Sequence, residues 1–291
     1  MTVVTAASTR TGRRVLDGAF HVAMLTGLLL GLATLVWLLT SVVVKGWPRL
    51  DSQLWEAFPS SRPARAGAKS ALYGTVWVMG LTALFTVPLG VGAAVYLEEF
   101  AQKERWWNRL VEVNIQNLAA VPSIVYGILG LAFVVRGPLD FGPTILAAGI
   151  ILSLLVLPTV IIASREAIRA VPPSIREGSL ALGATELQTV TRQVLPAATP
   201  GIATGVILGL SRAIGEAAPL LLVGALTFVQ FTPTGLDSRF AVLPVQIFQW
   251  SARPQEEFKV LAAAAIVMLL VVLLAMNAFA IWLRNRYQRR W

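Results

Sequence analysis

Six long apolar segments limit what this chain can fold into more than any other feature of its sequence. They cover residues 19–44, 71–97, 115–135, 144–164, 198–229 and 260–283. A helix of about 20 apolar residues crosses the hydrocarbon core of a bilayer and satisfies its own backbone hydrogen bonds there. Only 13% of the 291 residues are charged, about half the share found in a soluble domain. The sequence therefore predicts an all-α membrane protein with six transmembrane helices.

The distribution of lysine and arginine predicts the orientation of these helices. Basic side chains gather on the cytoplasmic side of a membrane. Seven arginines flank the first and last segments: Arg10, Arg13, Arg14, Arg284, Arg286, Arg289 and Arg290. Six crossings return the chain to the side on which it began, and the polar segments on that side carry 14 lysines and arginines against 9 on the other. We expect both termini in the cytoplasm.

Composition excludes several kinds of site. The chain has no cysteine and a single histidine, His21, so neither a thiolate metal site nor a zinc site is expected. The net charge of +9 resides in the polar segments between the apolar ones, which favours membrane anchoring over nucleic-acid binding. No G-x-x-x-x-G-K-[ST] phosphate loop occurs, so any ATP that drives this protein is expected to bind another chain.

An arginine and a glutamate lie one helical turn apart inside the fifth apolar segment, in the stretch SRAIGEAAPL, residues 211–220. Burying charge in a membrane is costly unless a partner or water compensates it. At 100° per residue, an ideal helix brings five residues within an arc of about 80°: Gly201, Gly205, Gly209, Arg212 and Glu216. Small residues let another helix approach closely. We therefore expect the glycines to be helix-packing residues and the charged pair to point into the same seam.

Two interpretations of the Arg212–Glu216 pair are open. The pair either locks two helices together or lies beside an ion path, which is the default expectation for charges at membrane depth. A guanidinium offers several coplanar donors to an oxyanion, whereas Glu216 would repel the same anion. We favour a switchable pair, in which Glu216 occupies Arg212 at rest and helix movement frees the guanidinium.

The polar segment 165–196 predicts a helix–turn–helix between the fourth and fifth transmembrane helices. Two pairs have the spacing of capping boxes, which begin helices: Ser174 with Glu177, and Thr185 with Gln188. Gly183 suits the positive φ found just after a helix, and Pro196 is expected to end the second helix. A narrow, mainly apolar stripe follows the second helix: Leu187, Val190, Thr191 and Val194. Such a helix lies on the membrane surface or docks into a groove of another protein.

Charged residues also fill the segment between the second and third transmembrane helices. They are Glu98, Glu99, Lys103, Glu104, Arg105, Arg109 and Glu112. Mixed charges of this kind usually form a solvated surface. We expect a solvated inner loop there.

The helix–turn–helix resembles the EAA loop of ABC importer permeases. The pattern of that loop is E-A-A, three residues, G, nine residues, I, one residue, L-P. Four positions match it: Glu177, Gly183, Leu195 and Pro196. Gly178 and Ser179 replace the two alanines, and Gln193 stands where isoleucine is usual.

The stretch SRAIGEAAPL resembles the R-A-I-G-E-T-A-P-L segment of the phosphate-specific permeases of bacterial ABC importers, with Ala217 where threonine is usual. The resemblance covers about 70–283. Further similar stretches are PLGVGAAVYLEEF, VPSIVYGILG, EAIRAVPPSIREGSLALGA and VLPAATPGIATGVILGLSRAIGE. VYLEEF and the short N-terminal segment look more like the A-type than the C-type of the two paralogous subunits.

The resemblance implies roles and partners. Arg212 and Glu216 would lie on the phosphate pathway. The ATPase-coupling residues would be Glu177, Gly183, Leu187, Val190, Leu195 and Pro196. The implied partners in the bacterial plasma (inner) membrane are a C-type permease subunit, a cytoplasmic ABC ATPase dimer that binds ATP and Mg²⁺, and an extracytoplasmic phosphate-binding protein. The implied organisation is a cytoplasmic tail (1–18), a first transmembrane helix (19–44), a permease domain (70–283) with its coupling loop (165–196), and a basic tail (284–291).

Three other functions are alternatives to this one. A proton-coupled secondary anion transporter could use Glu216, but it leaves the helix–turn–helix unexplained. An enzyme of lipid-phosphate chemistry needs paired acids with metal-ligand spacing or a nucleophile with its base, and the sequence offers neither. An ABC permease for sulfate or molybdate is the nearest alternative, and the RAIGE stretch argues against it.

Overall fold

The computed structural model describes residues 6–102, 104–225 and 228–287. Within these ranges the chain is helical and contains no strand. The helices are α1 (Ala6–Gly46), α2 (Ser52–Glu56), α3 (Lys69–Val95), α4 (Trp106–Ala120), α5 (Ser123–Gly130), α6 (Ile145–Arg169), α7 (Pro173–Ala181), α8 (Glu186–Thr189), α9 (Leu195–Ala213), α10 (Ala218–Val223), α11 (Leu243–Ser251) and α12 (Glu256–Tyr287). Short 3-10 turns lie at Trp47–Arg49 and Pro63–Arg65, and π-helical turns at Tyr96–Phe100, Leu131–Val135 and Val190–Val194.

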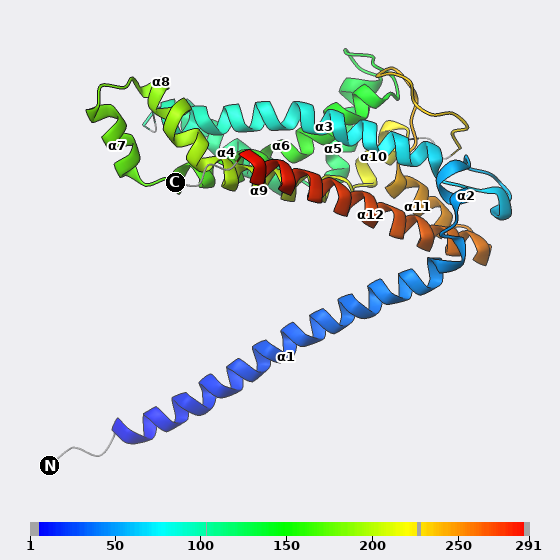
Figure 1. Ribbon diagram of the computed structural model, residues 1–291, viewed down its shortest axis with the longest axis horizontal. Coiled ribbons are helices and arrows are strands. Elements are labelled where there is room, and N and C mark those ends of the chain that lie inside the picture. Colours follow the sequence, from blue (N-terminus) through cyan, green and yellow to red (C-terminus); the bar gives the residue numbers. More distant parts are fainter. Residues whose placement is uncertain (1–5, 103, 226–227, 288–291) are drawn as a thin grey trace.

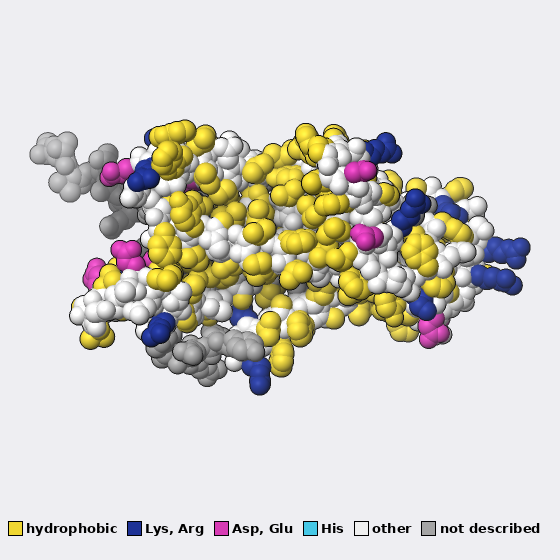
Figure 2. Space-filling model, turned by 90° about the horizontal axis from the view of Figure 1, so that it is seen from above, with side chains coloured by type: hydrophobic (Ala, Val, Ile, Leu, Met, Phe, Trp, Pro, Cys, Tyr) yellow, Lys and Arg dark blue, Asp and Glu magenta, His cyan; other side chains and the backbone are white. Residues whose placement is uncertain are grey.

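Five helical segments are long and apolar enough to cross a membrane. They are Asp17–Arg49, Lys69–Phe100, Ile145–Arg169, Glu186–Ala213 and Glu256–Arg286, and the bent pair α4 and α5 makes a sixth if it is counted as one span. Figure 2 shows hydrophobic side chains over the middle of the molecule and charged side chains mainly toward its two ends. That pattern suits a body whose middle lies in hydrocarbon and whose ends lie in water.

The core is built around α6, which packs against α3 on one side and α9 on another. Small residues bring these helices together: a Cβ added at Gly149 of α6 would lie 2.7 Å from Leu81 of α3. Close backbone approach of this kind is what membrane helices use in place of a hydrophobic driving force. The first described turn of α1, the last described turn of α12, α7 and α8 lie toward one end of the molecule in Figure 1, and α2 and α11 lie at the other.

Helix α1 stands apart from this body (Figure 1). It contacts α12 near its last turn, where a Cβ added at Gly46 would lie 2.7 Å from the backbone nitrogen of Ala264. The rest of its described apolar side chains, from Phe20 to Val44, are largely exposed. The first transmembrane segment is therefore a helix whose flanks the rest of this chain leaves uncovered.

The predicted third span, 115–135, is not a single straight helix. Helix α4 ends at Ala120, α5 begins at Ser123, and the two axes turn by 103°. Pro122 explains the break, because proline disfavours the helical conformation in the residue before it. Val121 is extended, with φ −68° and ψ 131°.

The predicted fifth span, 198–229, is also broken. Helix α9 ends at Ala213, the chain turns through residues 214–217, and the short helix α10 follows. Helix α10 ends at Val223 and is capped by Gly224 with φ +98°. Gly215 is a poor helix former, and Pro219 lies in the first turn of α10, where proline begins helices. Residues 226 and 227 lie outside the described ranges.

Candidate functional site

The break between α9 and α10 carries the predicted charged pair. Arg212 lies in the last turn of α9, and Glu216 lies beyond the helix end. Their side chains form an ion pair with 3.7 Å between Nε and Oε1. The Arg212 side chain is 63% exposed and that of Glu216 is 18% exposed. A strong charge-assisted hydrogen bond would be shorter, near 2.8 Å, so Glu216 holds the guanidinium loosely.

The pair lies deep along the bundle. Ala213 and Ile214 belong to the same buried cluster as Leu152 and Val156, near the middle of α6. Irregular backbone at membrane depth is tolerated only where protein covers it or where it lines water. The turn at 214–217 and the exposed guanidinium therefore need either a protein partner or an aqueous path beside them.

The prediction that three glycines and the charged pair share one face of a helix is wrong in one respect. Gly201, Gly205 and Gly209 lie against α6, whereas the Arg212 side chain is exposed and Glu216 follows the helix end. The projection assumed one continuous helix to Glu216, and the break at 214–217 redirects the chain. The glycine row and the charged pair are thus two separate features of this span.

Substituting Gly205 by Ala is expected to lower the thermal stability of the protein. A Cβ at this position would lie 2.3 Å from the Cβ of Ala163, a distance that forces α6 and α9 apart. The matched control is Gly92→Ala in α3, where no atom lies within 4 Å of the added Cβ and better helix propensity makes the change neutral or stabilising. Equal melting temperatures for both variants in detergent would contradict the close α6–α9 contact.

The predicted helix–turn–helix is present as α7 and α8. The Thr185–Gln188 capping box is confirmed: the Thr185 hydroxyl accepts from the Gln188 N–H at 3.3 Å, and the Gln188 side chain accepts from the Thr185 N–H at 3.0 Å. Gly183 has φ +85°, as expected for the residue after a helix. Leu182, next to it, is the most exposed of the large hydrophobic residues described, at 91%.

Two details of this hairpin were predicted wrongly. Helix α7 begins at Pro173, so Ser174 already lies in its first turn and caps nothing. Pro196 does not end the second helix, because α8, the π-helical turn Val190–Val194 and α9 form one helix from Glu186 to Ala213. The wider π turn before Pro196 relieves the clash between a proline ring and the preceding turn.

The predicted stripe on the second helix divides between two surfaces. Val190 and Val194 are buried, and Val194 packs in a cluster with Ile168 and Ala198. Leu187 is largely exposed. A groove of about 410 Å³ runs between α7 and α8. It is lined by Ser174, Ile175, Gly178, Ser179, Leu182, Ala184, Gln188, Arg192 and Gln193. Glu177 lies on α7, and Leu195 and Pro196 begin α9.

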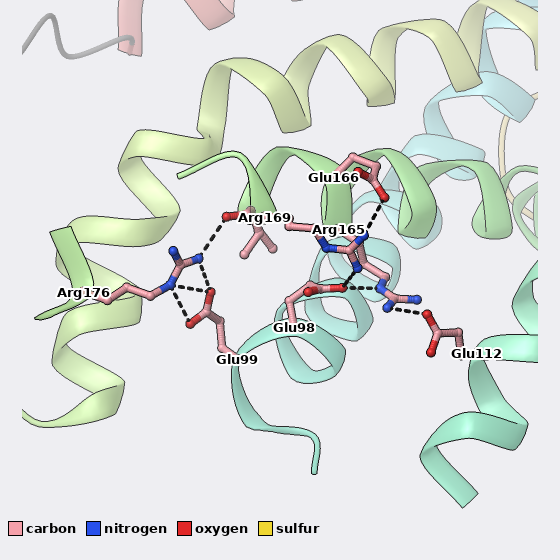
Figure 3. A network of polar contacts seen from close by, with 8 residues as sticks. Glu98, Glu99, Glu112, Arg165, Glu166, Arg169 and Arg176 are labelled. Atoms are coloured by element: carbon pink, nitrogen blue, oxygen red, sulfur yellow. Dashed lines mark hydrogen bonds and ion pairs between the residues drawn. The ribbon is translucent and has the colours of Figure 1, made fainter. Parts of the chain in front are cut away.

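A network of ion pairs lies where α3, α4, α6 and α7 meet (Figure 3). Glu98 Oε1 accepts from Arg165 Nε and from Arg169 Nη2, both at 2.7 Å, and Arg165 Nη2 donates to Glu112 at 2.8 Å. The Glu98 side chain is only 5% exposed. A second pair joins Arg176 Nη2 to Glu99 Oε1 at 2.7 Å. Within the described ranges, no three acidic, histidine or cysteine side chains are arranged to hold a metal ion.

This network corrects the expectation of a solvated loop at Glu98, Glu99 and Glu112. All three carboxylates pair with arginines from α6 or α7, and two of them are almost buried. The sequence does contain a signal for this network. Two glutamates directly follow the second apolar segment and three arginines follow the fourth, and both segments end on the same predicted side of the membrane. Lys103 lies outside the described ranges, and Arg105 and Arg109 are exposed as expected.

Comparison with known proteins identifies the family to which this arrangement belongs. Residues 86–290 match the family model described as binding-protein-dependent transport system inner membrane component. The chain is 32% identical over 283 residues to phosphate transport system permease protein PstA 1 of Mycobacterium tuberculosis, covering 96% of this chain and 91% of that protein. It is 33% identical over 255 residues to the PstA of Yersinia pestis, covering 87% and 84%.

A solved structure shares the fold. A chain of the bacterial alginate ABC transporter, in complex with an alginate pentasaccharide-bound periplasmic protein, superposes with a TM-score of 0.65 at 18% identity. The superposition covers 98% of this chain and 99% of that chain. The described helices therefore have the arrangement of an ABC importer permease. This chain belongs to the family of binding-protein-dependent transport system inner membrane components and, within it, to the PstA-type permeases.

Proposed function

We propose that this chain is the A-type permease subunit of an ATP-driven importer of inorganic phosphate, and that the anion passes beside Arg212 and Glu216. The observation that carries the proposal is an exposed arginine at a break in a membrane-spanning helix. The names of relatives that match almost the whole chain agree with phosphate as the substrate.

The energetics of a charge at this depth favour a pathway. An exposed guanidinium in hydrocarbon is unfavourable, so Arg212 must face water or another protein chain. Its fork of N–H donors matches the oxygens of a phosphate ion, and a dry or partly dry path strengthens such contacts. Glu216, at 3.7 Å, is close enough to neutralise the arginine at rest and loose enough to release it.

A second permease subunit of the C-type is the proposed partner beside this surface. Two features of the chain leave room for it: the uncovered flanks of α1 and the exposed side of α9 at Arg212. An extracytoplasmic phosphate-binding protein would deliver the ion at the end of the molecule that carries α2 and α11. The proposed location is the bacterial inner membrane, with α7, α8 and both chain ends in the cytoplasm.

A cytoplasmic ABC ATPase dimer is proposed to dock on the α7–α8 hairpin and to bind the ATP and Mg²⁺. Leu182 and Leu187 are exposed there beside the groove between the two helices. Exposed apolar side chains at the tip of a polar hairpin are typical of a docking surface. The chain itself would then be a transport subunit with no catalytic role of its own.

Substituting Gly183 by Val is expected to uncouple ATP hydrolysis from transport. No atom lies within 4 Å of a Cβ placed there, but the φ of +85° costs an L residue roughly 1 to 2 kcal/mol, and a β-branched residue more. The turn would therefore change conformation. The measurement is phosphate-stimulated ATP hydrolysis in liposomes. Gly92→Ala is the control, because Gly92 is helical, lies outside the hairpin and has equally open space around it.

The test of the proposed function is purification of this chain with its neighbours, followed by reconstitution. We expect an ATP-hydrolysing subunit to co-purify, and phosphate with its binding protein to stimulate hydrolysis and uptake. Uptake that needs a proton gradient but no ATP would indicate a secondary transporter instead. Stimulation by sulfate or molybdate, but not by phosphate, would identify a different oxyanion.

A further inference from the structure

Helix α7 has no buried residue to hold it in place. None of its nine residues, Pro173–Ala181, is buried. A helix of this length is not stable on its own in water. Polar contacts with the rest of the chain therefore contribute much of what holds it in position, and Arg176 supplies most of those described.

The Arg176 guanidinium contacts three places at once. Nη2 donates to Glu99 Oε1 at 2.7 Å and to the Ile168 carbonyl at 2.9 Å, while Nη1 donates to the Val171 carbonyl at 2.7 Å. Nε lies 3.3 Å from both oxygens of Glu99. Glu99 belongs to the π-helical turn that follows α3. The Ile168 carbonyl lies in the last turn of α6, and the Val171 carbonyl lies two residues beyond the end of that helix. Carbonyls at a helix end lack intrahelical partners and favour a cation.

The π-helical turn that carries Glu99 is also held in place through its neighbour Glu98. Glu98, next to Glu99, is buried under Arg165 and Arg169 of α6, and Arg165 also holds Glu112 of α4 (Figure 3). Glu99 is therefore anchored to a rigid part of the bundle. On the hairpin side, the hydroxyls of Ser179 and Thr189 lie 2.9 Å apart and join α7 to the helix that continues as α9.

We propose that Arg176 is the positioning residue that transmits movement of the α7–α8 hairpin to α3 and α6, by clamping α7 to Glu99 and to the end of α6. This inference rests on the proposed function, because it assumes that an ATPase moves the hairpin. Lysine replaces arginine only in part here, because one ammonium group cannot reach a carboxylate and two carbonyls with the geometry of a planar fork.

The test uses the reconstituted complex with its ATPase and phosphate-binding protein. Arg176→Gln is expected to assemble and to hydrolyse ATP, but to lose at least tenfold in phosphate transported per ATP hydrolysed. Glu99→Gln is expected to act in the same way, and Arg176→Lys to fall between. Glu166→Gln is the matched control, because Glu166 is an exposed partner of Arg169, and the ratio should stay at the wild-type value.

A covalent cross-link in place of the Arg176–Glu99 ion pair distinguishes a role in transmitting movement from a general loss of structure. The chain has no cysteine, so Arg176→Cys with Glu99→Cys supplies the only two thiols of this chain, and a short bifunctional maleimide can join them. We expect cross-linking to restore the transported phosphate per ATP. Failure of the cross-linked pair to recover, or wild-type coupling in Arg176→Gln, would overturn the clamp. A wild-type complex in which phosphate stimulates nothing would instead overturn the proposed function.

Discussion

Replacing Arg212 by Gln is expected to abolish measurable phosphate uptake while the complex still assembles. The side chain is exposed and belongs to no buried cluster, so its removal costs the fold little. What is lost is a cation with several donors at the break in the fifth span. Charge-assisted hydrogen bonds of this kind are each worth about 1.5 to 3 kcal/mol, which corresponds to roughly a 10- to 150-fold loss for every contact made with the ion. The measurement is uptake of labelled phosphate by proteoliposomes under saturating ATP.

Three further variants make the result for Arg212 specific. Arg212→Lys keeps the charge without the planar fork and is expected to retain partial uptake. Arg109→Gln removes an exposed arginine of α4 and should leave uptake unchanged. Glu216→Gln leaves the guanidinium without its partner, so we expect tighter phosphate binding with slower turnover. If Arg212→Gln and Glu216→Gln both impaired only assembly, the pair would be a lock between helices and not part of a pathway.

Replacing Glu98 by Gln is expected to cause the largest loss of stability among the charged positions. The substitution keeps the shape of the side chain but removes the carboxylate that Arg165 and Arg169 share. Breaking a buried ion pair by removing one partner costs about 3 to 5 kcal/mol, because the remaining charge is left uncompensated. Since Arg165 keeps Glu112, we expect a value of about 3 kcal/mol, at the lower end of that range.

The measurement for Glu98→Gln is thermal unfolding in detergent. At this chain length a loss of about 3 kcal/mol corresponds to a fall in the melting temperature of roughly 5 °C. The control is again Glu166→Gln, whose exposed ion pair with Arg169 is expected to contribute less than about 1 kcal/mol. Similar melting temperatures for the two variants would mean that the network around Glu98 is as weak as a surface ion pair.

Local patterns in the sequence predicted local structure well. The apolar segments became helices because the length and hydropathy of a span are local properties. The Thr185–Gln188 capping box and the positive φ of Gly183 are likewise set by a few neighbouring residues. The family resemblance, carried by the hairpin and by the stretch around Arg212, was confirmed over most of the chain.

Breaks and long-range pairs were harder to predict. The turn at 214–217 lies inside the apolar segment 198–229, whose overall hydropathy does not reveal a break. The projection of Glu216 onto α9 failed for that reason. The ion network joins residues far apart in sequence: Arg165 and Glu112 are 53 positions apart, and Arg176 and Glu99 are 77 apart. Charge type alone does not indicate which of many arginines meets which glutamate.

The uninterrupted helix from Glu186 to Ala213 acts geometrically as a lever with unequal arms. Its 28 residues span about 42 Å, and we take its tightest glycine contact with α6, that of Gly205 with Ala163, as the pivot. The arm toward Glu186 is then about 28 Å long and the arm toward Arg212 about 10 Å. Tilting such a rod by about 10° would sweep the hairpin end through about 5 Å and the guanidinium through about 2 Å. A large movement of the hairpin therefore becomes a smaller displacement of the Arg212 guanidinium, of the order of a hydrogen-bond length.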